Sequence, residues 1–214
     1  MRFIHASDLH IDSPLRGLDR YDGAPVERLR SATRSALERL VDKALAERVD
    51  FLLLAGDIYD RDWQDFHTGL FFRGQMVRLE RAGIRCFIVQ GNHDAQGVIS
   101  RQLTLPSNVT VFSSRAAQTV KLDELSVAIH GRSFPEREVN EDLVPSYPPP
   151  VSGYFNIGLL HTSLTGRAGH DTYAPTDLPT LVAKGYDYWA LGHVHACEVL
   201  NERPRIVFCG NLQG

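Results

Sequence analysis

The stretch 51-FLLLAGDIYD-60 decides the architecture of this chain. Its first five residues are apolar without interruption, and the run ends at Gly56-Asp57. An alternating pattern would predict a strand with one face in water, whereas a short continuous apolar run is typical of a strand covered on both faces. We therefore expect residues 51–55 to form a central strand of an α/β sheet.

The segments around this run continue the same pattern. Residues 2–6 and 85–90 are expected to be strands, and apolar residues at helical spacing predict helices from Pro25 to about Arg48 and over about 65–82. Strands that alternate with helices predict βαβ units and a mainly parallel sheet.

The second half of the chain changes character. Its first short pieces alternate between apolar and polar residues, which predicts a second, more antiparallel sheet. The stretch 135–153 is rich in proline and acidic residues and is expected to be a surface loop, and 177–185 is expected to be a short helix. The strands expected in this half are 109–113, 118–122, 125–130, 154–161, 186–195 and 205–210.

Composition limits the class of protein. The chain has 214 residues, 43% hydrophobic and 23% charged, with a net charge of −3, so no general basic surface indicates nucleic-acid binding. We find no signal peptide and no apolar run long enough to span a membrane. Three widely spaced cysteines without a CxxC motif predict a reducing cytoplasm and small core residues. Cys197, near two histidines, is also a candidate soft metal ligand.

Polar side chains follow five of the expected strands, where an α/β sheet binds its ligands. Seven oxygen and nitrogen donors exceed the four of a typical zinc site and fit two metals that share a carboxylate. Without a thiolate, such a set favours Mn²⁺ or Fe²⁺. The candidate ligands are Asp8, His10, Asp57, Asn92, His161, His193 and His195. The other histidines, His5, His67, His130 and His170, are expected at the surface or hydrogen-bonded in the core.

His193 and His195 are two residues apart, so in extended backbone their rings point the same way. An isolated pair of this kind is more often hydrogen-bonded at a turn. Beside five other donors, the pair is predicted to bind two adjacent metals. Gly56 and Gly91 precede Asp57 and Asn92, and glycine permits a sharp turn and close approach of the backbone.

The ordered motifs 8-DLH-10, 56-GDIYD-60, 91-GNHD-94, His161 and 192-GHVH-195 resemble the calcineurin-like metallophosphoesterase superfamily. Four further stretches resemble bacterial DNA-repair exonucleases of the SbcD and YhaO type, the YhaO-like branch best. The resemblance implies a two-sheet α/β/β/α sandwich with its metal site at the C-terminal ends of strands. It also implies that residues 1–214 are the nuclease domain of a longer chain with a C-terminal DNA- or partner-binding region. The four stretches are 7-SDLHIDSPLRGL-18, 130-HGRSFPE-136, 170-HDTYAP-175 and 184-KGYDYWALGHVH-195.

The same resemblance implies a role for each site residue. The first metal would be held by Asp8, His10, Asp57 and His195, and the second by Asp57, Asn92, His161 and His193, with Asp57 bridging. His93 would face the scissile phosphate, and Asp94 would orient His93. Archaeal relatives carry a histidine where this chain has Asp60, so Asp60 is expected to be a hydrogen-bond acceptor outside the ligand set.

The implied activity is that of a Mn²⁺-dependent exonuclease acting on DNA ends in repair. By the same likeness it would be a cytoplasmic homodimer with an SMC-like ATPase partner of the SbcC/YhaN type and no membrane association. A phosphodiesterase or phosphatase acting on a small nucleotide-like substrate is an alternative, because one metal centre serves all these reactions. A non-catalytic, metal-bound repair scaffold is a second alternative, which the intact His93 and full ligand set disfavour.

Overall fold

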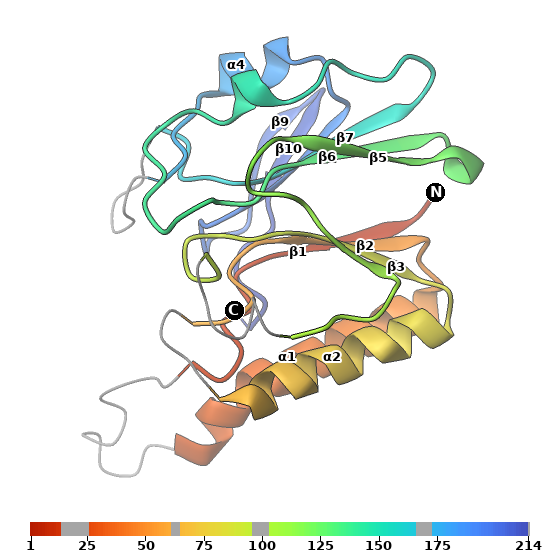
Figure 1. Ribbon diagram of the computed structural model, residues 1–214, viewed down its shortest axis with the longest axis vertical. Coiled ribbons are helices and arrows are strands. Elements are labelled where there is room, and N and C mark those ends of the chain that lie inside the picture. Colours follow the sequence, from red (N-terminus) through yellow and green to blue (C-terminus); the bar gives the residue numbers. More distant parts are fainter. Residues whose placement is uncertain (14–25, 61–64, 96–102, 166–172, 214) are drawn as a thin grey trace.

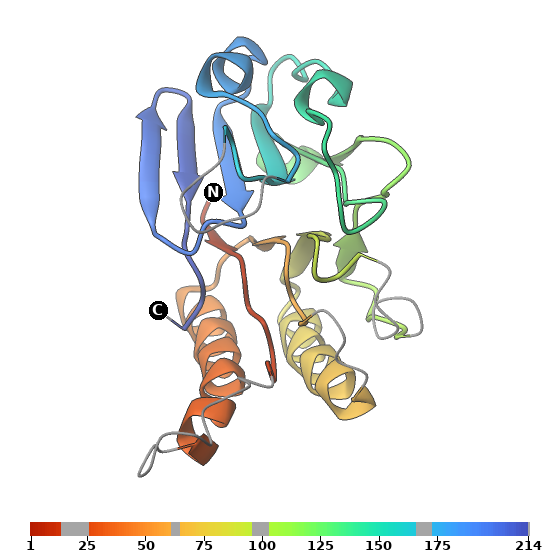
Figure 2. The same cartoon turned by 90° about the vertical axis from the view of Figure 1, so that its left-hand side faces the viewer.

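The computed structural model describes residues 1–13, 26–60, 65–95, 103–165 and 173–213, with the backbone alone for 26–30. Four layers are stacked (Figure 1). Helices α1 (Val26–Glu47) and α2 (Phe66–Arg81) lie side by side against one sheet, a second sheet packs on its other face, and α4 (Leu178–Ala183) with several loops covers the far side (Figures 1 and 2). The predicted α/β/β/α sandwich is confirmed.

The first sheet is parallel throughout and contains, in spatial order, β1 (Phe3–Ala6), β2 (Phe51–Ala55), β3 (Arg85–Val89) and β4 (Val109–Val111). The apolar run 51–55 forms β2, and all five of its residues are fully buried. Alternate side chains of β2 enter two separate cores. Phe51, Leu53 and Ala55 pack between the sheets, whereas Leu52 and Leu54 pack against the helices.

The second sheet has the order β5-β6-β7-β8-β10-β9. Its central pairs are parallel, and only the two outermost pairs are antiparallel. The expectation of a more antiparallel sheet is therefore wrong for its centre. The connections before β7 and β8 cross the outer face of the sheet, so these strands run parallel. The bounds are β5 Gln118–Leu122, β6 Val127–Gly131, β7 Phe155–His161, β8 Tyr188–Gly192, β9 Glu198–Glu202 and β10 Arg205–Phe208.

Three further expectations need correction. Residues 109–111, expected in the second sheet, extend the first sheet as β4. Strand β9 was not anticipated. The expected surface loop 135–153 includes a 3₁₀ turn, Val144–Ser146, and buries Leu143, Val144 and Tyr147 in the outer core. The Tyr147 hydroxyl donates to the Leu159 carbonyl oxygen at 2.8 Å, which attaches this loop to β7.

The cysteines are all free thiols, but only Cys86 is a core residue as expected. Cys209 is half-buried, and Cys197 is exposed. The helices in the described ranges include none with the length and apolar character needed to cross a membrane.

Candidate metal centre

The carboxyl ends of β1, β2, β3, β7 and β8 meet at one edge of the sandwich, the side that faces the viewer in Figure 2. Backbone hydrogen bonds align the segments that follow these strands. The Asp8 amide donates to the Gly56 carbonyl at 3.0 Å, and the His10 amide donates to the Asp57 carbonyl at 3.1 Å. In the second sheet His161 pairs with Gly192, so His161 lies beside the segment that carries His193. All seven expected ligands thus come to the same edge.

The first group consists of Asp8, His10 and His195, whose candidate ligand atoms all lie within 4.8 Å of one another. One oxygen of Asp8, Oδ2, accepts from Ser7 Oγ at 2.5 Å and from the His193 amide at 3.0 Å. Its other oxygen, Oδ1, lies 3.8 Å from His195 Nε2. Nothing in the sequence pointed to the part played by Ser7.

Two atoms of this group bear on whether a metal fits. Asp8 Oδ1 and His10 Nε2 are buried, and neither has a hydrogen-bond partner in the described part of the chain. Buried polar atoms are rarely left in this state, because losing water without a replacement is unfavourable. A divalent cation bound between a carboxylate oxygen and an imidazole nitrogen would satisfy both atoms.

The second group consists of Asp57, His161 and His193, again within 4.8 Å. His161 Nε2 lies 3.4 Å from Asp57 Oδ2 and 3.0 Å from Asn92 Oδ1. The other ring nitrogen, Nδ1, lies 2.8 Å from the Ala55 carbonyl oxygen, which can only accept. This contact places the proton on Nδ1 and leaves the Nε2 lone pair directed at the carboxylate and amide oxygens, as a metal-binding histidine requires.

Asp57 and His161 shift each other's ionisation in the metal-free chain. Burial alone would raise the pKa of Asp57, but the nearby His161 ring lowers it below its ordinary value. Burial alone would lower the pKa of His161, and the Asp57 carboxylate raises it to about 9. A charged Asp57 at neutral pH is the form that binds a cation.

The backbone brings these ligands unusually close. A methyl group added at Gly91 would lie 2.4 Å from Asp57 Oδ1 and 2.8 Å from His161 Nε2, so only glycine fits there. Three expected ligands, Asp8, His10 and Asp57, have φ between 41° and 53°, a left-handed conformation that non-glycine residues adopt at an energetic cost. Such strain, concentrated at one edge of a fold, is typical of a functional site.

His93 lies next to the first group, and its ring centroid is 4.8 Å from that of His10. The carboxylate beside it belongs to Asp60, whose Oδ1 is 2.8 Å from His93 Nδ1 and 3.8 Å from His10 Nδ1. Ser13 Oγ donates to the other oxygen of Asp60 at 2.6 Å. The hydrogen bond to His93 lowers the pKa of Asp60 below its ordinary value. Asp60 therefore has the hydrogen-bond acceptor position expected from the sequence.

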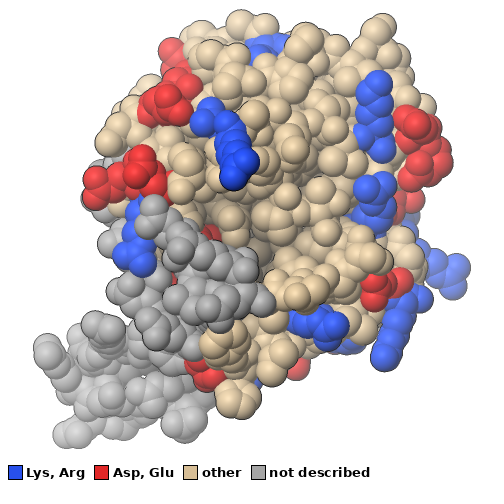
Figure 3. Space-filling model, viewed as in Figure 1, with Lys and Arg blue, Asp and Glu red and all other residues tan. Residues whose placement is uncertain are grey.

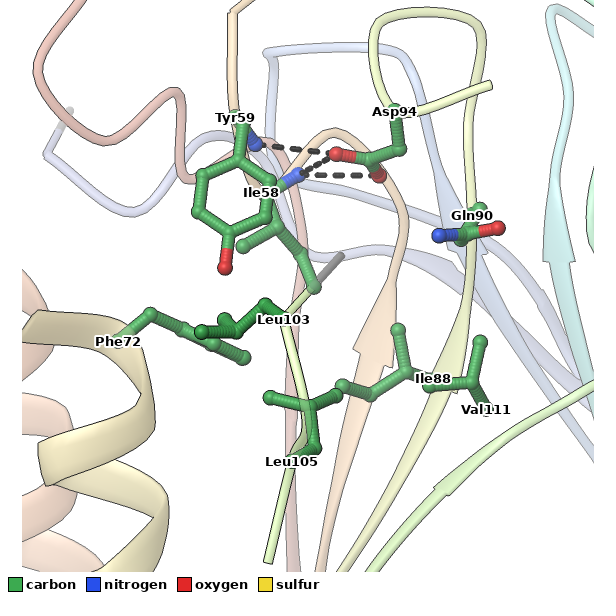
Figure 4. A pocket seen from close by; sticks show the side chains of 9 residues that line it. All are labelled: Ile58, Tyr59, Phe72, Ile88, Gln90, Asp94, Leu103, Leu105 and Val111. Carbon is green, nitrogen blue, oxygen red and sulfur yellow. Dashed lines mark hydrogen bonds between the residues drawn. The ribbon is translucent and has the colours of Figure 1, made fainter. Parts of the chain in front are cut away.

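Asp94 has a different set of contacts. Its buried carboxylate accepts hydrogen bonds from the backbone amides of Ile58, Tyr59 and Gly91 at 3.0–3.3 Å. Burial, together with the Asp57 charge, raises the pKa of Asp94 to about 7. The carboxylate lies at one end of a largely apolar cavity of about 230 Å³ between α2 and β3 (Figure 4). Asp94 thus joins the segment after β2 to the segment after β3, whereas Asp60 contacts the His93 ring.

The remaining histidines behave as expected where they are described. His5 Nε2 lies 3.1 Å from the Leu191 carbonyl oxygen, and His130 is buried between Thr119 and Asn156. His67 is exposed near the start of α2, and its Nδ1 lies 2.8 Å from Asp65 Oδ1. His170 lies outside the described residues. The exposed Cys197 is absent from the metal-ligand groups found among the described residues.

Known proteins with similar sequences share this metal-centre pattern. The calcineurin-like phosphoesterase family matches residues 1–197. The uncharacterized metallophosphoesterase YhaO of Bacillus subtilis is 37% identical over the whole chain and 53% of its own length. The SbcD component of the Escherichia coli nuclease SbcCD is 28% identical over 99% of this chain and 60% of its own, and the double-strand break repair protein Mre11 of Methanopyrus kandleri is 25% identical over 91% and 44%. The chain therefore spans about half the length of these relatives.

A solved structure has the same fold. The dimetal phosphatase from Danio rerio superposes with a TM-score of 0.58 over 99% of this chain and 88% of its own, at 11% identity. At this identity the likeness concerns the fold alone. The family match, the fold and the two groups of aspartate and histidine ligands together show that this chain belongs to the calcineurin-like phosphoesterase family of metal-dependent hydrolases.

Proposed function

We propose that this chain is a Mn²⁺-dependent exonuclease domain that acts on DNA ends in repair. The observation that carries the proposal is the convergence of oxygen and nitrogen donors from five strand ends, with His93 beside them. The 28% identity to the SbcD component of the nuclease SbcCD supports DNA over other phosphodiesters. Because the relatives are about twice as long, we also propose that residues 1–214 are the nuclease domain of a longer protein.

We propose a ligand set for two metals, with Asp57 as the bridge. Asp8, His10 and His195 complete the first site, and Asn92, His161 and His193 complete the second. When bound, two divalent ions would offset phosphate charge and lower the pKa of a shared water molecule. Four positive charges against the two carboxylates give the site a net charge of about +2. This local charge attracts a phosphodiester although the chain as a whole carries −3.

His93 is proposed to donate a proton to the leaving 3′ oxygen. A carboxylate can only accept, so the 2.8 Å contact with Asp60 places a proton on His93 Nδ1. The opposite nitrogen, Nε2, is then the atom that gains and releases the transferred proton. The Asp60 charge stabilises the ring while it carries both protons. Asp94, in contrast, orients His93 only through the backbone that it holds.

The proposed partners are DNA, a second copy of the chain and an SMC-like ATPase of the SbcC type, in a cytoplasmic complex. Helix α2 exposes Phe66 and Leu70, which supports its use as a contact between copies. Figure 3 shows basic and acidic side chains in small scattered groups on one face of the molecule. On that face a broad basic surface does not contribute to DNA binding, so the proposed attraction comes from the metal centre.

The test is Mn²⁺-dependent cleavage of end-labelled linear DNA, with a bis-aryl phosphodiester in parallel. His93→Ala should retain two bound Mn²⁺ ions and lose about 10²–10⁴-fold in rate, the usual contribution of a general acid. The control is His67→Ala, which removes an exposed histidine outside the site and should leave the rate unchanged. Asp57→Ala should lose the two-metal stoichiometry.

Each outcome discriminates between the candidate functions. A wild-type rate in His93→Ala would refute its role, and two tightly bound ions in Asp57→Ala would refute the bridge. Cleavage of the small diester without DNA cleavage would favour the phosphodiesterase alternative. Two bound metals without any cleavage would favour the scaffold alternative.

A further inference from the structure

Two of the three free thiols lie opposite each other beside the metal centre. In the antiparallel pair β9–β10, Phe208 is opposite Glu198, so the next position along places Cys209 opposite Cys197. The same register holds on the far side of this pair, where the Asn211 amide donates to the His195 carbonyl oxygen at 3.2 Å. Cys197 and Cys209 are therefore bracketed on both sides as a cross-strand pair.

The geometry is close to that of a disulfide. Opposed residues of an antiparallel pair have Cβ atoms about 4.5–5.5 Å apart, and a disulfide needs about 3.5–4.5 Å. A movement of about 1 Å closes this difference. Both residues lie just outside the ends of their strands, where the ladder restrains them least. Burial raises the pKa of Cys209 to about 12, and the neighbouring Cys197 contributes to the rise, so the two thiols interact.

Both cysteines are connected to expected ligands of the same metal. Cys209 Sγ lies 3.1 Å from Ser7 Oγ, and Ser7 Oγ donates to Asp8 Oδ2 at 2.5 Å. Because that hydrogen bond uses the single hydroxyl proton of Ser7, the Cys209 thiol is the donor to Ser7. Cys197 follows His195 by two residues. Joining the two sulfurs would remove the thiol donor to Ser7 and pull on the segment that carries His195.

We propose that Cys197 and Cys209 form a reversible disulfide that is a redox-sensitive modification site of the metal centre. The oxidant is a low-molecular-weight disulfide. The exposed Cys197 thiolate attacks one of its sulfurs, forms a mixed disulfide and releases one thiolate, which takes up a proton. Cys209 then attacks the Cys197 sulfur and releases the second small thiol. The two cysteines lose two electrons, and one small disulfide becomes two thiols.

The oxidised form is expected to bind metal more weakly. Changes to groups that hold metal ligands from behind typically reduce metal affinity by 10–100-fold, and the disulfide alters two such groups, so we expect at least a tenfold loss for one Mn²⁺. By linkage, bound Mn²⁺ disfavours the disulfide by the same factor. This coupling rests on the proposed ligand set, whereas the disulfide itself does not.

The experiment treats the reduced chain with glutathione disulfide, with and without Mn²⁺. Peptide mass mapping should find Cys197 and Cys209 linked, with the loss of two hydrogens, and Cys86 still a thiol. Cys197→Ser should form no link. The matched control Cys86→Ala should form the link as the wild type does, because Cys86 is buried in a different core. Calorimetric Mn²⁺ titration then compares the oxidised and reduced forms.

The outcomes are separable. A persistent mixed disulfide on Cys197, or a link that involves Cys86, would overturn the modification site. Equal Mn²⁺ affinity in both redox forms would overturn the coupling. A reduced wild-type chain that binds no Mn²⁺ would count against the proposed function, while the mass mapping would still decide the disulfide.

Discussion

Replacing Asp60 with asparagine tests whether the carboxylate beside His93 is part of the chemistry. The substitution keeps the size of the side chain and its contact with Ser13, but removes the negative charge 2.8 Å from His93 Nδ1. An asparagine can also present its NH₂ group to the ring, which would place the Nδ1 proton on the wrong nitrogen. We expect the hydrolysis rate to fall while the metals stay bound.

The size of the effect follows from the geometry of the pair. Two unit charges 2.8 Å apart attract by about 1.5 kcal/mol in water and about 6 kcal/mol at an effective dielectric constant of 20. Both side chains are roughly one-fifth exposed, at 22% and 23%, which favours the lower part of this range. Hydrogen bonds to charged groups contribute about 1.5–3 kcal/mol. At 1.36 kcal/mol per factor of ten, the expected loss in rate is about 10–150-fold.

The assay is Mn²⁺-dependent hydrolysis of the bis-aryl phosphodiester at saturating metal, with bound Mn²⁺ measured separately. The chain supplies a matched control in Asp65, whose carboxylate also contacts a histidine, His67, at 2.8 Å but on the exposed surface. Asp65→Asn should leave the rate unchanged, since asparagine also serves as the N-cap of α2. A rate for Asp60→Asn within twofold of wild type would refute the reasoning. Loss of a Mn²⁺ ion would instead assign the effect to His10, 3.8 Å away.

Three other predictions concern packing and stability. Gly91→Ala should lose metal binding, because its methyl group would occupy the space between two ligands; Gly74→Ala, with no atom near the new methyl group, should bind Mn²⁺ normally, and equal binding by both would contradict the clash. Burial lowers the pKa of His5 to about 4, against about 6.5 in the unfolded chain, so the unfolded state binds the additional proton as the pH falls through this window. Urea unfolding should therefore show wild type losing about 2 kcal/mol more than His5→Gln between pH 7 and pH 5, and parallel losses would show that His5 is not responsible. Trp189→Ala should reduce the free energy of unfolding by about 3–5 kcal/mol, whereas Val182→Ala on exposed α4 should change it by less than about 0.5 kcal/mol; similar values for both would contradict the core assignment.

Much of the fold was predictable because its signals are local. The continuous apolar run 51–55 indicated a strand buried on both faces, and β2 has this environment in full. Helices α1 and α2 begin and end within about two residues of their expected bounds, because apolar spacing and end signals act over a few residues. The donors at the strand ends were also visible, since a chain places Asp, Asn and His after apolar strands only at recognisable turns.

The choice of neighbours, in contrast, depended on contacts between distant segments. The three residues of β4 carry too little pattern to show which sheet they join, and the register with β3 decides it. The parallel centre of the second sheet follows from the path of its connections over the outer face, where Tyr147 is buried. Strand β9 is stabilised by its pairing with β10 rather than by an apolar run.

The same division applies to the site. The sequence by itself determined which residues can bind metal, because ligand chemistry belongs to the side chain. Only the tertiary structure decided that Asp60 lies against His93, that Ser7 supports Asp8, and that Cys197 faces Cys209. These pairs join segments that are close in space through the stacking of two sheets, and no local pattern in a sequence records a distance across that stacking.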